Sequence, residues 1–345
     1  MWTESTRQGL QELGCLVQVF YYYRNRAQQQ MSPVLKQVLQ RMRLSEFSLS
    51  NWVKQLLKIW LGWQVGQCLI QEAVLFQPDV VLVLKGEILL PSTLHALKHR
   101  TGAVIATWWV DSPLLFNDRY RWLVFPRCAP LYDHCFIFDY AYFEPLRRMG
   151  AQQITFLPCA ADPKLYHPET LASGERCHLE STVCLIGLFH PARGEIVENL
   201  LSQPGLAIWG PGWDKFFGKR QERLVHKIWR GIGLPPAEIN KVYQTSAIAI
   251  NTHHPQTQRG GLNSRAFEIP ASGAFELMDY VNEMESLLLP GREVACFHSP
   301  AEVATLVRDL LGDPETRGRI ARAGHECVLA EHTYRHRMQR VLASL

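Results

Sequence analysis

Several common sequence signals are missing from this 345-residue chain. Its nine cysteines include no CxxC pair, so a disulfide-rich miniprotein is excluded and free thiols in a reducing cytosol are expected. The net charge of +4 is too small and too dispersed for a dedicated nucleic-acid binder. The N-terminus has no cationic segment followed by an apolar one, so no secretion signal is expected. From the cysteine pattern and the missing secretion signal we expect a cytoplasmic protein.

Two phosphate-binding motifs are missing as well. No GxGxxG follows an expected strand and no GxxxxGK[ST] occurs, so neither a dinucleotide fingerprint nor a P-loop is present. Neither absence excludes a nucleotide that is held by other means. Cys128, His134 and Cys135 lie close together in the sequence, but a zinc site needs about four ligands, so no metal and no bound cofactor are expected.

No apolar run is long and uncharged enough to cross a membrane. Residues 52–76 carry Lys54, Lys58 and Glu72, and a helix packed against a core or a bilayer surface is expected there. Residues 1–60 hold eight Lys or Arg against three Glu, with several aromatic residues. Such a face can touch the inner face of an anionic membrane. A solvated helix face over an ordinary core explains the same pattern and is the interpretation we favour.

Apolar runs of strand length alternate with helical patterns, which indicates parallel sheets with crossover helices. The length fits two domains better than one. We predict an α/β fold of two Rossmann-like, doubly wound sheets that face a cleft. The predicted parts are an acceptor-side domain at 1–165, a linker at 166–181, a nucleotide-sugar-binding domain at 182–325, and a helical tail at 326–345 that packs back on the first domain.

The expected elements follow this division. Strands are predicted at 15–22, 80–84, 103–110, 135–138 and 154–158, and then at 182–186, 206–210, 247–251 and 275–279. Helices are predicted at 4–13, 30–76, 91–99, 142–149, 300–311 and 314–330, and from 332 onward.

The segment 259–273, between two expected strands, carries the strongest site signal. Gly260 and Gly261 let the backbone approach a ligand closely, and Asn263 is suited to cap the helix that follows. A helix start offers unpaired amide donors and the positive end of the helix dipole, which suits a phosphate or diphosphate.

Charged residues of the same segment fit this interpretation. Arg259 and Arg265 would add charge-assisted bonds to the phosphate oxygens, and Glu268 can accept hydrogen bonds from ribose hydroxyls. Taken one at a time, Asn263 is only a cap, the arginines are solvated, and Glu268 forms a salt bridge with one of them. The grouping of all four favours the site.

The same block carries a family resemblance. The sequence NSRAFEIPASGAFELMDY, together with PGREVACF, IARAGHECVLAEHTYRHRM, VCLIGLFHPARGEIVENL, IWGPGW, VVLVLKGEILLP and ATWWVDSP, is similar to CgeB-like glycosyltransferases, a branch of the GT-B superfamily with a C-terminal domain like that of the group 1 glycosyl transferases. The resemblance implies a GT-B fold, which agrees with the two sheets expected above. It also implies transfer of a hexosyl or related sugar from a nucleotide-sugar donor to a glycan, a lipid-linked molecule or a protein, without a metal.

The resemblance also implies roles for single residues. Glu268 would hold the ribose, and the loop from Gly187 to Arg193 would reach the diphosphate, with Arg193 as its cation. Trp213 would lie near the base pocket. Asn263 and Arg265 match the helix entry of the family, so both would bind the donor as well.

Catalysis then needs an acceptor for the proton of the attacking hydroxyl. Asp111, at the abrupt end of an expected strand, is the candidate base, and Glu87 is the second choice. An Asx-type cap before Pro113 is an equally good explanation of Asp111. Fixed donors aimed at the charge that develops on the leaving diphosphate would do the main catalytic work.

The sequence departs from the family pattern in two places. Many retaining GT-B enzymes carry a Glu eight residues before the ribose Glu, where this chain has Gly260, so the stereochemistry is undecided. The first strand of the usual N-terminal sheet is expected to be missing. Two alternatives therefore stay open, a catalytically silent nucleotide-sugar-binding protein and a sugar-nucleotide epimerase of the same fold.

Overall fold

The chain forms two compact units in the computed structural model, which describes residues 2–21, 51–114, 119–170, 181–218 and 227–345. The first unit comprises Met1–Leu157 and Met338–Leu345, and the second comprises Pro158–Arg337. The boundary therefore falls earlier than residue 165, and the last residues of the tail group with the first unit. Each unit has its own cluster of buried apolar side chains.

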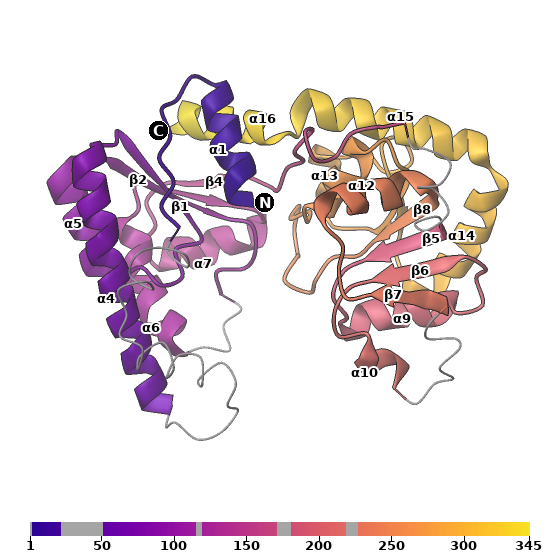
Figure 1. Ribbon diagram of the computed structural model, residues 1–345, viewed down its shortest axis with the longest axis horizontal. Helices are drawn as coiled ribbons and strands as arrows, with labels where there is room; N and C mark the ends of the chain where they lie inside the picture. Colours follow the sequence, from indigo (N-terminus) through magenta and orange to yellow (C-terminus); the bar gives the residue numbers. More distant parts are fainter. Residues whose placement is uncertain (1, 22–50, 115–118, 171–180, 219–226) are drawn as a thin grey trace. The chain divides into compact units, whose positions relative to one another are not determined.

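A parallel four-stranded sheet in the order β1-β2-β3-β4 is the centre of the first unit (Figure 1). Most strands expected there are confirmed within two residues. The elements are α1 (Trp2–Glu12), α4 (Asn51–Phe76), β1 (Val80–Leu84), α5 (Pro91–Thr101), β2 (Val104–Trp109), α6 (Arg119–Cys128), β3 (His134–Ile137), α7 (Phe143–Arg148) and β4 (Ile154–Phe156).

The prediction of a strand at 15–22 is wrong. Residues 15–21 form no strand, although apolar side chains predominate along them. Leu16 is 86% exposed, so part of this apolar surface faces solvent. A strand also needs a partner edge for its backbone hydrogen bonds, and the sequence pattern does not reveal whether one is within reach.

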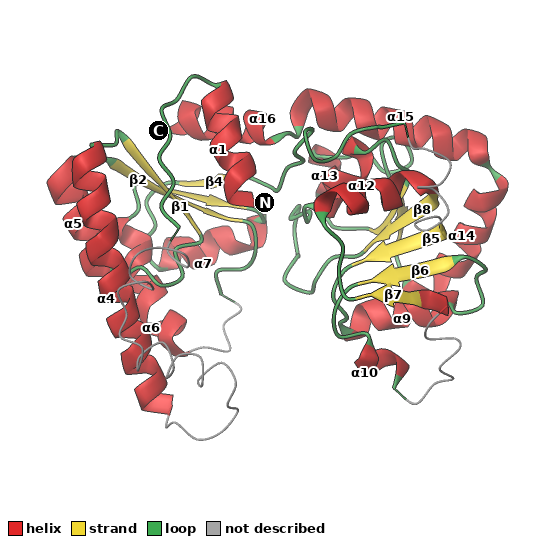
Figure 2. Cartoon of the chain, viewed as in Figure 1, coloured by secondary structure: helices red, strands yellow, loops and turns green. Residues whose placement is uncertain are grey.

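The second unit contains a parallel six-stranded sheet in the order β10-β9-β8-β5-β6-β7, part of which Figure 2 shows as adjacent arrows. Its strands are β5 (Ser181–Ile186), β6 (Leu206–Trp209), β7 (Trp229–Gly231), β8 (Ser246–Asn251), β9 (Glu276–Asp279) and β10 (Ala295–Phe297). The sequence analysis did not predict β7 and β10, which have three residues each. Its helices are α9 (Pro191–Leu200), α10 (Asp214–Phe217), α12 (Pro236–Thr245), α13 (Arg265–Ala271), α14 (Val303–Gly312), α15 (Pro314–Glu331) and the start of α16 (Tyr334–Ser344).

The strand order of this sheet reverses between β5 and β8. From β5 the chain builds outward through β6 and β7, and then returns to place β8 on the other side of β5. The loops that leave the carboxyl ends of β5 and β8 therefore run in opposite directions. Ligands of open α/β sheets bind at such a switch point, so the topology indicates where a site should be sought.

The structure bears on two expectations about membranes, one about spanning helices and one about a basic N-terminal face. Within the described ranges, no helix combines the length and the apolar character that a bilayer crossing requires. Residues 22–50, which carry five of the eight basic side chains of the expected membrane face, lie outside the described residues.

Candidate functional site

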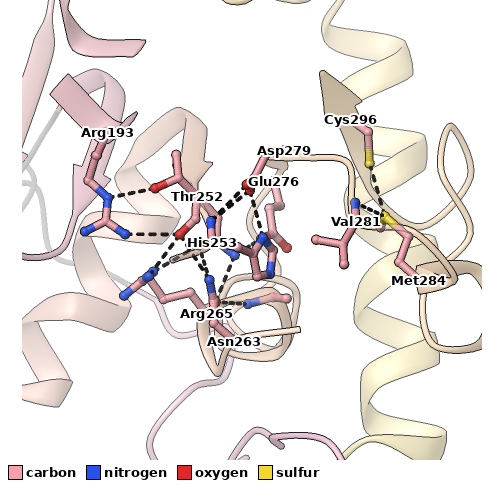
Figure 3. A network of polar contacts seen from close by, with 12 residues as sticks. Arg193, Thr252, His253, Asn263, Arg265, Glu276, Asp279, Val281, Met284 and Cys296 are labelled. Atoms are coloured by element: carbon pink, nitrogen blue, oxygen red, sulfur yellow. Dashed lines mark hydrogen bonds and ion pairs between the residues drawn. The ribbon is translucent and has the colours of Figure 1, made fainter. Parts of the chain in front are cut away.

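Polar side chains gather at the carboxyl ends of β5, β8 and β9 and at the starts of the two helices α9 and α13 (Figure 3). We refer to them as the switch-point cluster, which consists of His190, Arg193, Asn251, Thr252, His253, Asn263, Arg265 and Asp279.

Arg193, in the first turn of α9, crosses from β5 to β8. Its Nε donates to Thr252 Oγ1 at 2.7 Å, its Nη2 donates to the Thr252 carbonyl at 3.1 Å, and its Nη1 donates to the Leu188 carbonyl. The residue is only 4% exposed. Burial, followed by repulsion from the nearby Arg265, lowers the pKa of Arg193 to about 9, so the guanidinium is still charged at neutral pH.

Two glycines make room for this arrangement. A Cβ on Gly187 would lie 2.6 Å from Nη1 of Arg193, so a side chain there would displace the guanidinium. Gly210, at φ +145°, lies against the Gly187 backbone, and its Cβ would lie 2.0 Å from the Gly187 carbonyl oxygen. That carbonyl also accepts a hydrogen bond from Trp213 Nε1 at 2.9 Å.

The role expected for Trp213 needs correction for this reason. Its side chain is fully buried in the apolar core of the second unit, where it makes edge contacts with Phe189 and Phe216. A ring enclosed on all sides has no face on which a base can stack. Trp213 supports the Gly187 loop instead of lining a base pocket.

Arg265 and Asn263 enter the cluster from the start of α13. Asn263 and Asn251 pair their amides reciprocally, at 3.1 and 3.0 Å, and Arg265 Nε donates to Asn251 Oδ1 at 3.0 Å. Arg265 Nη2 donates to the Thr252 carbonyl at 3.3 Å, so both arginines converge on Thr252 (Figure 3). The expected cap is present, because Asn263 Oδ1 accepts from the Ala266 amide at 3.3 Å.

These two cations lack a counter-ion in the part of the chain that the structure describes. Neither Arg193 nor Arg265 has a carboxylate oxygen within 4.0 Å there. The amides of Asn263, Ser264 and Arg265 donate to no described residue either. Buried or half-buried cations are normally paired with an anion, whereas these guanidinium groups bond only neutral oxygens, so their uncompensated charge fits an anionic ligand.

His253 and Asp279 form a second feature of the cluster. Asp279, at the end of β9, accepts from the His253 backbone amide at 2.9 Å and contacts the ring nitrogen Nδ1 at 2.7 Å. The side chain of His253 is 3% exposed, and its other nitrogen, Nε2, is buried without a partner among the described residues.

His190 caps α9 from the other side. Its Nδ1 accepts from the Arg193 amide at 3.4 Å, and burial together with the charge of Arg193 lowers its pKa to about 4. The ring is therefore neutral at physiological pH, and the proton resides on Nε2.

Two buried carboxyl groups lie behind the cluster. Glu276 is 2% exposed, and it accepts from Asn251 Nδ2 at 2.8 Å through one oxygen, while the other is buried without a described partner. Burial raises the pKa of Glu276 to about 8 and that of Glu268 to about 7. Glu268, the expected ribose ligand, is 6% exposed, and Arg265 and Ser264 offset part of its shift.

A substitution of Glu276 by glutamine tests this burial. The folded state keeps a proton that the unfolded carboxyl loses, so the free energy of unfolding should fall as pH rises from about 4.5 to about 8. Glu276→Gln removes this slope, and its stability relative to the wild type should increase by about 3 kcal/mol between pH 5.5 and 8.5. Urea unfolding at both values measures the difference, and a constant offset between the two proteins would contradict the shift.

Arg259 is not part of the cluster. Its Nε and Nη2 donate to Glu283 Oε1 at 2.9 and 2.6 Å, and both side chains are about half exposed. The expectation that Arg259 binds the donor is thus not supported by its position, because it would first have to leave this surface pair.

The expected catalytic carboxylates belong to the first unit. Asp111 follows β2 and forms an ion pair with Lys85, which follows the neighbouring strand β1. Both therefore lie at the carboxyl edge of their sheet. Glu87 is half-buried and lines a small cavity beside Trp109 and Phe125.

The structure gives no support to a metal at the cysteines. Among the residues described, no group of three or more His, Cys, Asp or Glu side chains is placed to hold an ion. Burial raises the pKa values of Cys128 and Cys135 to about 12, so both thiols stay protonated and pack as small apolar groups. Every cysteine that the structure describes is free.

Sequence reasoning missed His253, Asp279 and Thr252. A usable signal was present: these residues directly follow, or end, the expected strands 247–251 and 275–279. Side chains at the carboxyl ends of adjacent parallel strands meet at one edge of the sheet.

Comparisons with solved structures define the class of fold. HepE from Anabaena, solved in complex with UDP-glucose, superposes with a TM-score of 0.60 at 12% identity, over 82% of each chain. Sucrose-phosphate synthase from Thermosynechococcus elongatus gives 0.59 at 14% identity, over 83% of this chain and 78% of that one. Both are GT-B glycosyltransferases, and the predicted α/β fold of the GT-B type is confirmed.

Sequence comparisons found a family model and a relative that this chain resembles. Residues 193–343 match the family model described as "Glycosyl transferase-like". Spore protein CgeB from Bacillus subtilis is 20% identical over 270 residues, which cover 75% of this chain and 80% of that protein. The resemblance to CgeB-like GT-B glycosyltransferases is thereby confirmed.

Proposed function

We propose that this protein is a glycosyltransferase that takes a sugar from a nucleotide-sugar donor, whose diphosphate binds at the switch-point cluster. The observation that carries the proposal is the pair Arg193 and Arg265, which converge on Thr252 at the switch point without a carboxylate partner among the described residues. A diphosphate would supply the missing negative charge.

The comparisons support the same ligand class. Solved neighbours include HepE with UDP-glucose and an Escherichia coli protein, described as trehalose-6-phosphate, with UDP-2-fluoro glucose. The latter superposes with a TM-score of 0.62 at 13% identity, over 82% of this chain and 77% of that one. We infer a uridine nucleotide as the first donor to test, with a hexosyl group as the transferred sugar.

In this proposal the cluster acts on the leaving group. As the bond between the anomeric carbon and the phosphate oxygen breaks, negative charge grows on the diphosphate. The guanidinium groups of Arg193 and Arg265 and the amides at the start of α13 are fixed before the reaction, so they stabilise this charge with little rearrangement. Glu268 would hold the ribose, and the chain's own residues would provide these contacts without a metal.

A panel of nucleotides tests the proposal. The protein's melting temperature is measured with UDP, GDP, dTDP and CDP, because a ligand that binds the native state raises it. We expect one of these nucleoside diphosphates to raise the melting temperature. We also expect the protein to transfer or hydrolyse the sugar of the matching nucleotide sugar. Binding without turnover toward any acceptor would favour a silent binding protein, and product from the donor alone would favour an epimerase. No shift with any nucleotide would contradict the proposal.

Asp111→Asn tests the acceptor side. If Asp111 accepts the proton of the attacking hydroxyl, turnover should fall by about 100-fold or more while donor affinity stays unchanged. Asp133→Asn is the matched control, because that carboxylate also pairs with a lysine, Lys98, at the surface of the same unit. Full turnover of a folded Asp111→Asn protein would show that Asp111 is not the catalytic base, and Glu87 would be the next candidate.

A further inference from the structure

His253 presents one nitrogen whose bonding the protein does not complete. The carboxylate of Asp279 can only accept, so the contact of 2.7 Å places a proton on Nδ1. In the neutral ring Nε2 is then a bare acceptor, and this atom is buried without a partner among the described residues. A buried polar atom left without a hydrogen bond is costly, so such an atom indicates a missing partner.

The missing partner must offer a hydrogen. Thr252, Arg193 and Arg265 are next to His253 in the cluster, but their donors are directed to the Thr252 oxygens, the Leu188 carbonyl and Asn251. A diphosphate offers only acceptor oxygens at neutral pH, so it satisfies the arginines and leaves Nε2 of His253 unpaired. A sugar hydroxyl can donate to Nε2.

His253 and Asp279, which we call the dyad, are also placed and held rigidly enough to recognise a ligand. His253 directly follows Thr252, on which both arginines converge, and Figure 3 shows its ring next to Asp279. Asp279 fixes the ring through two contacts, one to the backbone amide of His253 and one to Nδ1. The charge of Asp279 also acts on Arg193 and His190, so the dyad belongs to the same electrostatic environment as the proposed diphosphate site.

We propose that Nε2 of His253 accepts a hydrogen bond from a hydroxyl of the donor's sugar, and that Asp279 positions the ring for this contact. The proposal deepens the proposed function and rests on it, since it assumes that the diphosphate of a nucleotide sugar occupies the cluster. A buried acceptor that only a hydroxyl satisfies discriminates against donors that lack it.

The test compares a nucleotide with and without its sugar. Affinities for UDP and UDP-glucose are measured by calorimetry on the full chain. His253→Asn keeps a donor for Asp279 at the position of Nδ1 but removes the distal acceptor, whereas His253→Gln restores a polar oxygen near the position of Nε2. We expect His253→Asn to bind UDP as the wild type does and UDP-glucose about tenfold more weakly, and His253→Gln to recover most of that loss.

Further variants separate the alternatives. Asp279→Asn keeps an oxygen for the Nδ1 proton but removes the charge that would stabilise a protonated ring, so its UDP-glucose affinity should stay within about threefold of the wild type. His99→Ala, at an exposed histidine on α5 of the first unit, should change neither affinity.

Four outcomes would overturn the assignment. Equal weakening of UDP and UDP-glucose in His253→Asn would indicate a phosphate contact or a purely structural role. No change with either ligand would indicate that Nε2 is satisfied by a buried water. A loss in Asp279→Asn as large as that in His253→Asn would indicate a protonated ring that donates. A wild type that binds neither ligand would overturn the proposed uridine donor itself, which distinguishes that failure from the other three.

Discussion

Replacing Arg193 with methionine is expected to weaken UDP binding by about 100-fold, which corresponds to about 3 kcal/mol. The guanidinium is buried, and it lacks a carboxylate partner in the described part of the chain. Its charge is therefore available to phosphate oxygens in a region from which water is largely excluded, where charge-assisted bonds are strong. Methionine keeps much of the apolar volume of the side chain but has no donor. Calorimetric titration with UDP measures the loss.

The control for this variant is Arg308→Met. Arg308 lies on α14, is largely exposed and pairs with its neighbour Asp309, so its loss should leave UDP affinity unchanged. Thermal unfolding of the Arg193→Met protein shows whether the fold persists, since the Leu188 and Thr252 carbonyls lose a donor. An intact Arg193→Met protein that binds UDP normally would remove the cluster as the diphosphate site.

Replacing Gly210 with alanine is expected to destabilise the second unit by about 3 kcal/mol or more. The backbone there has φ +145°, which side chains rarely tolerate, and the added Cβ would lie 2.0 Å from the Gly187 carbonyl oxygen. Neither partner can move easily, because the Gly187 carbonyl is held by Trp213 and the Gly187 amide by the Trp209 carbonyl. Urea unfolding followed by tryptophan fluorescence measures the loss.

Gly233→Ala is the matched control. Its added Cβ would meet no heavy atom within 4 Å, so the free energy of unfolding should change by less than about 1 kcal/mol. In Gly210→Ala protein that still folds, displacement of the Gly187 loop should also weaken UDP binding, because Gly187 borders the guanidinium of Arg193. Equal stability of the two variants would show that the close approach of Gly210 to Gly187 does not persist in solution.

The strands of both units could largely be predicted, because a strand covered on both faces is a short run of apolar residues bounded by turns. Runs such as Val80–Leu84 and Ser246–Asn251 have this character, and the structure confirms them. Segment 15–21 is an equally suggestive apolar run but forms no strand, since pairing depends on an edge that lies elsewhere in the chain.

The candidate site was predictable where function depends on backbone positions close in sequence. Local pattern selected Asn263 and Arg265, which open one helix, whereas the family resemblance selected Gly187 and Arg193, which follow one strand. The assignments of Trp213 and Arg259 failed for the opposite reason. Whether a tryptophan is enclosed, or an arginine is paired with Glu283, depends on neighbours that the local sequence does not contain.

The sequence by itself determined the class of this protein: two parallel α/β sheets, the GT-B resemblance, and a cationic loop before a helix. Tertiary structure alone decided which charges lack partners and which atoms meet. His253 and Asp279 are 26 residues apart and form a dyad only because β8 and β9 are adjacent parallel strands whose carboxyl ends share an edge. Hydrogen bonding and desolvation depend on distances in space, so the unpaired cations and the bare Nε2 emerge only when the sheet has formed.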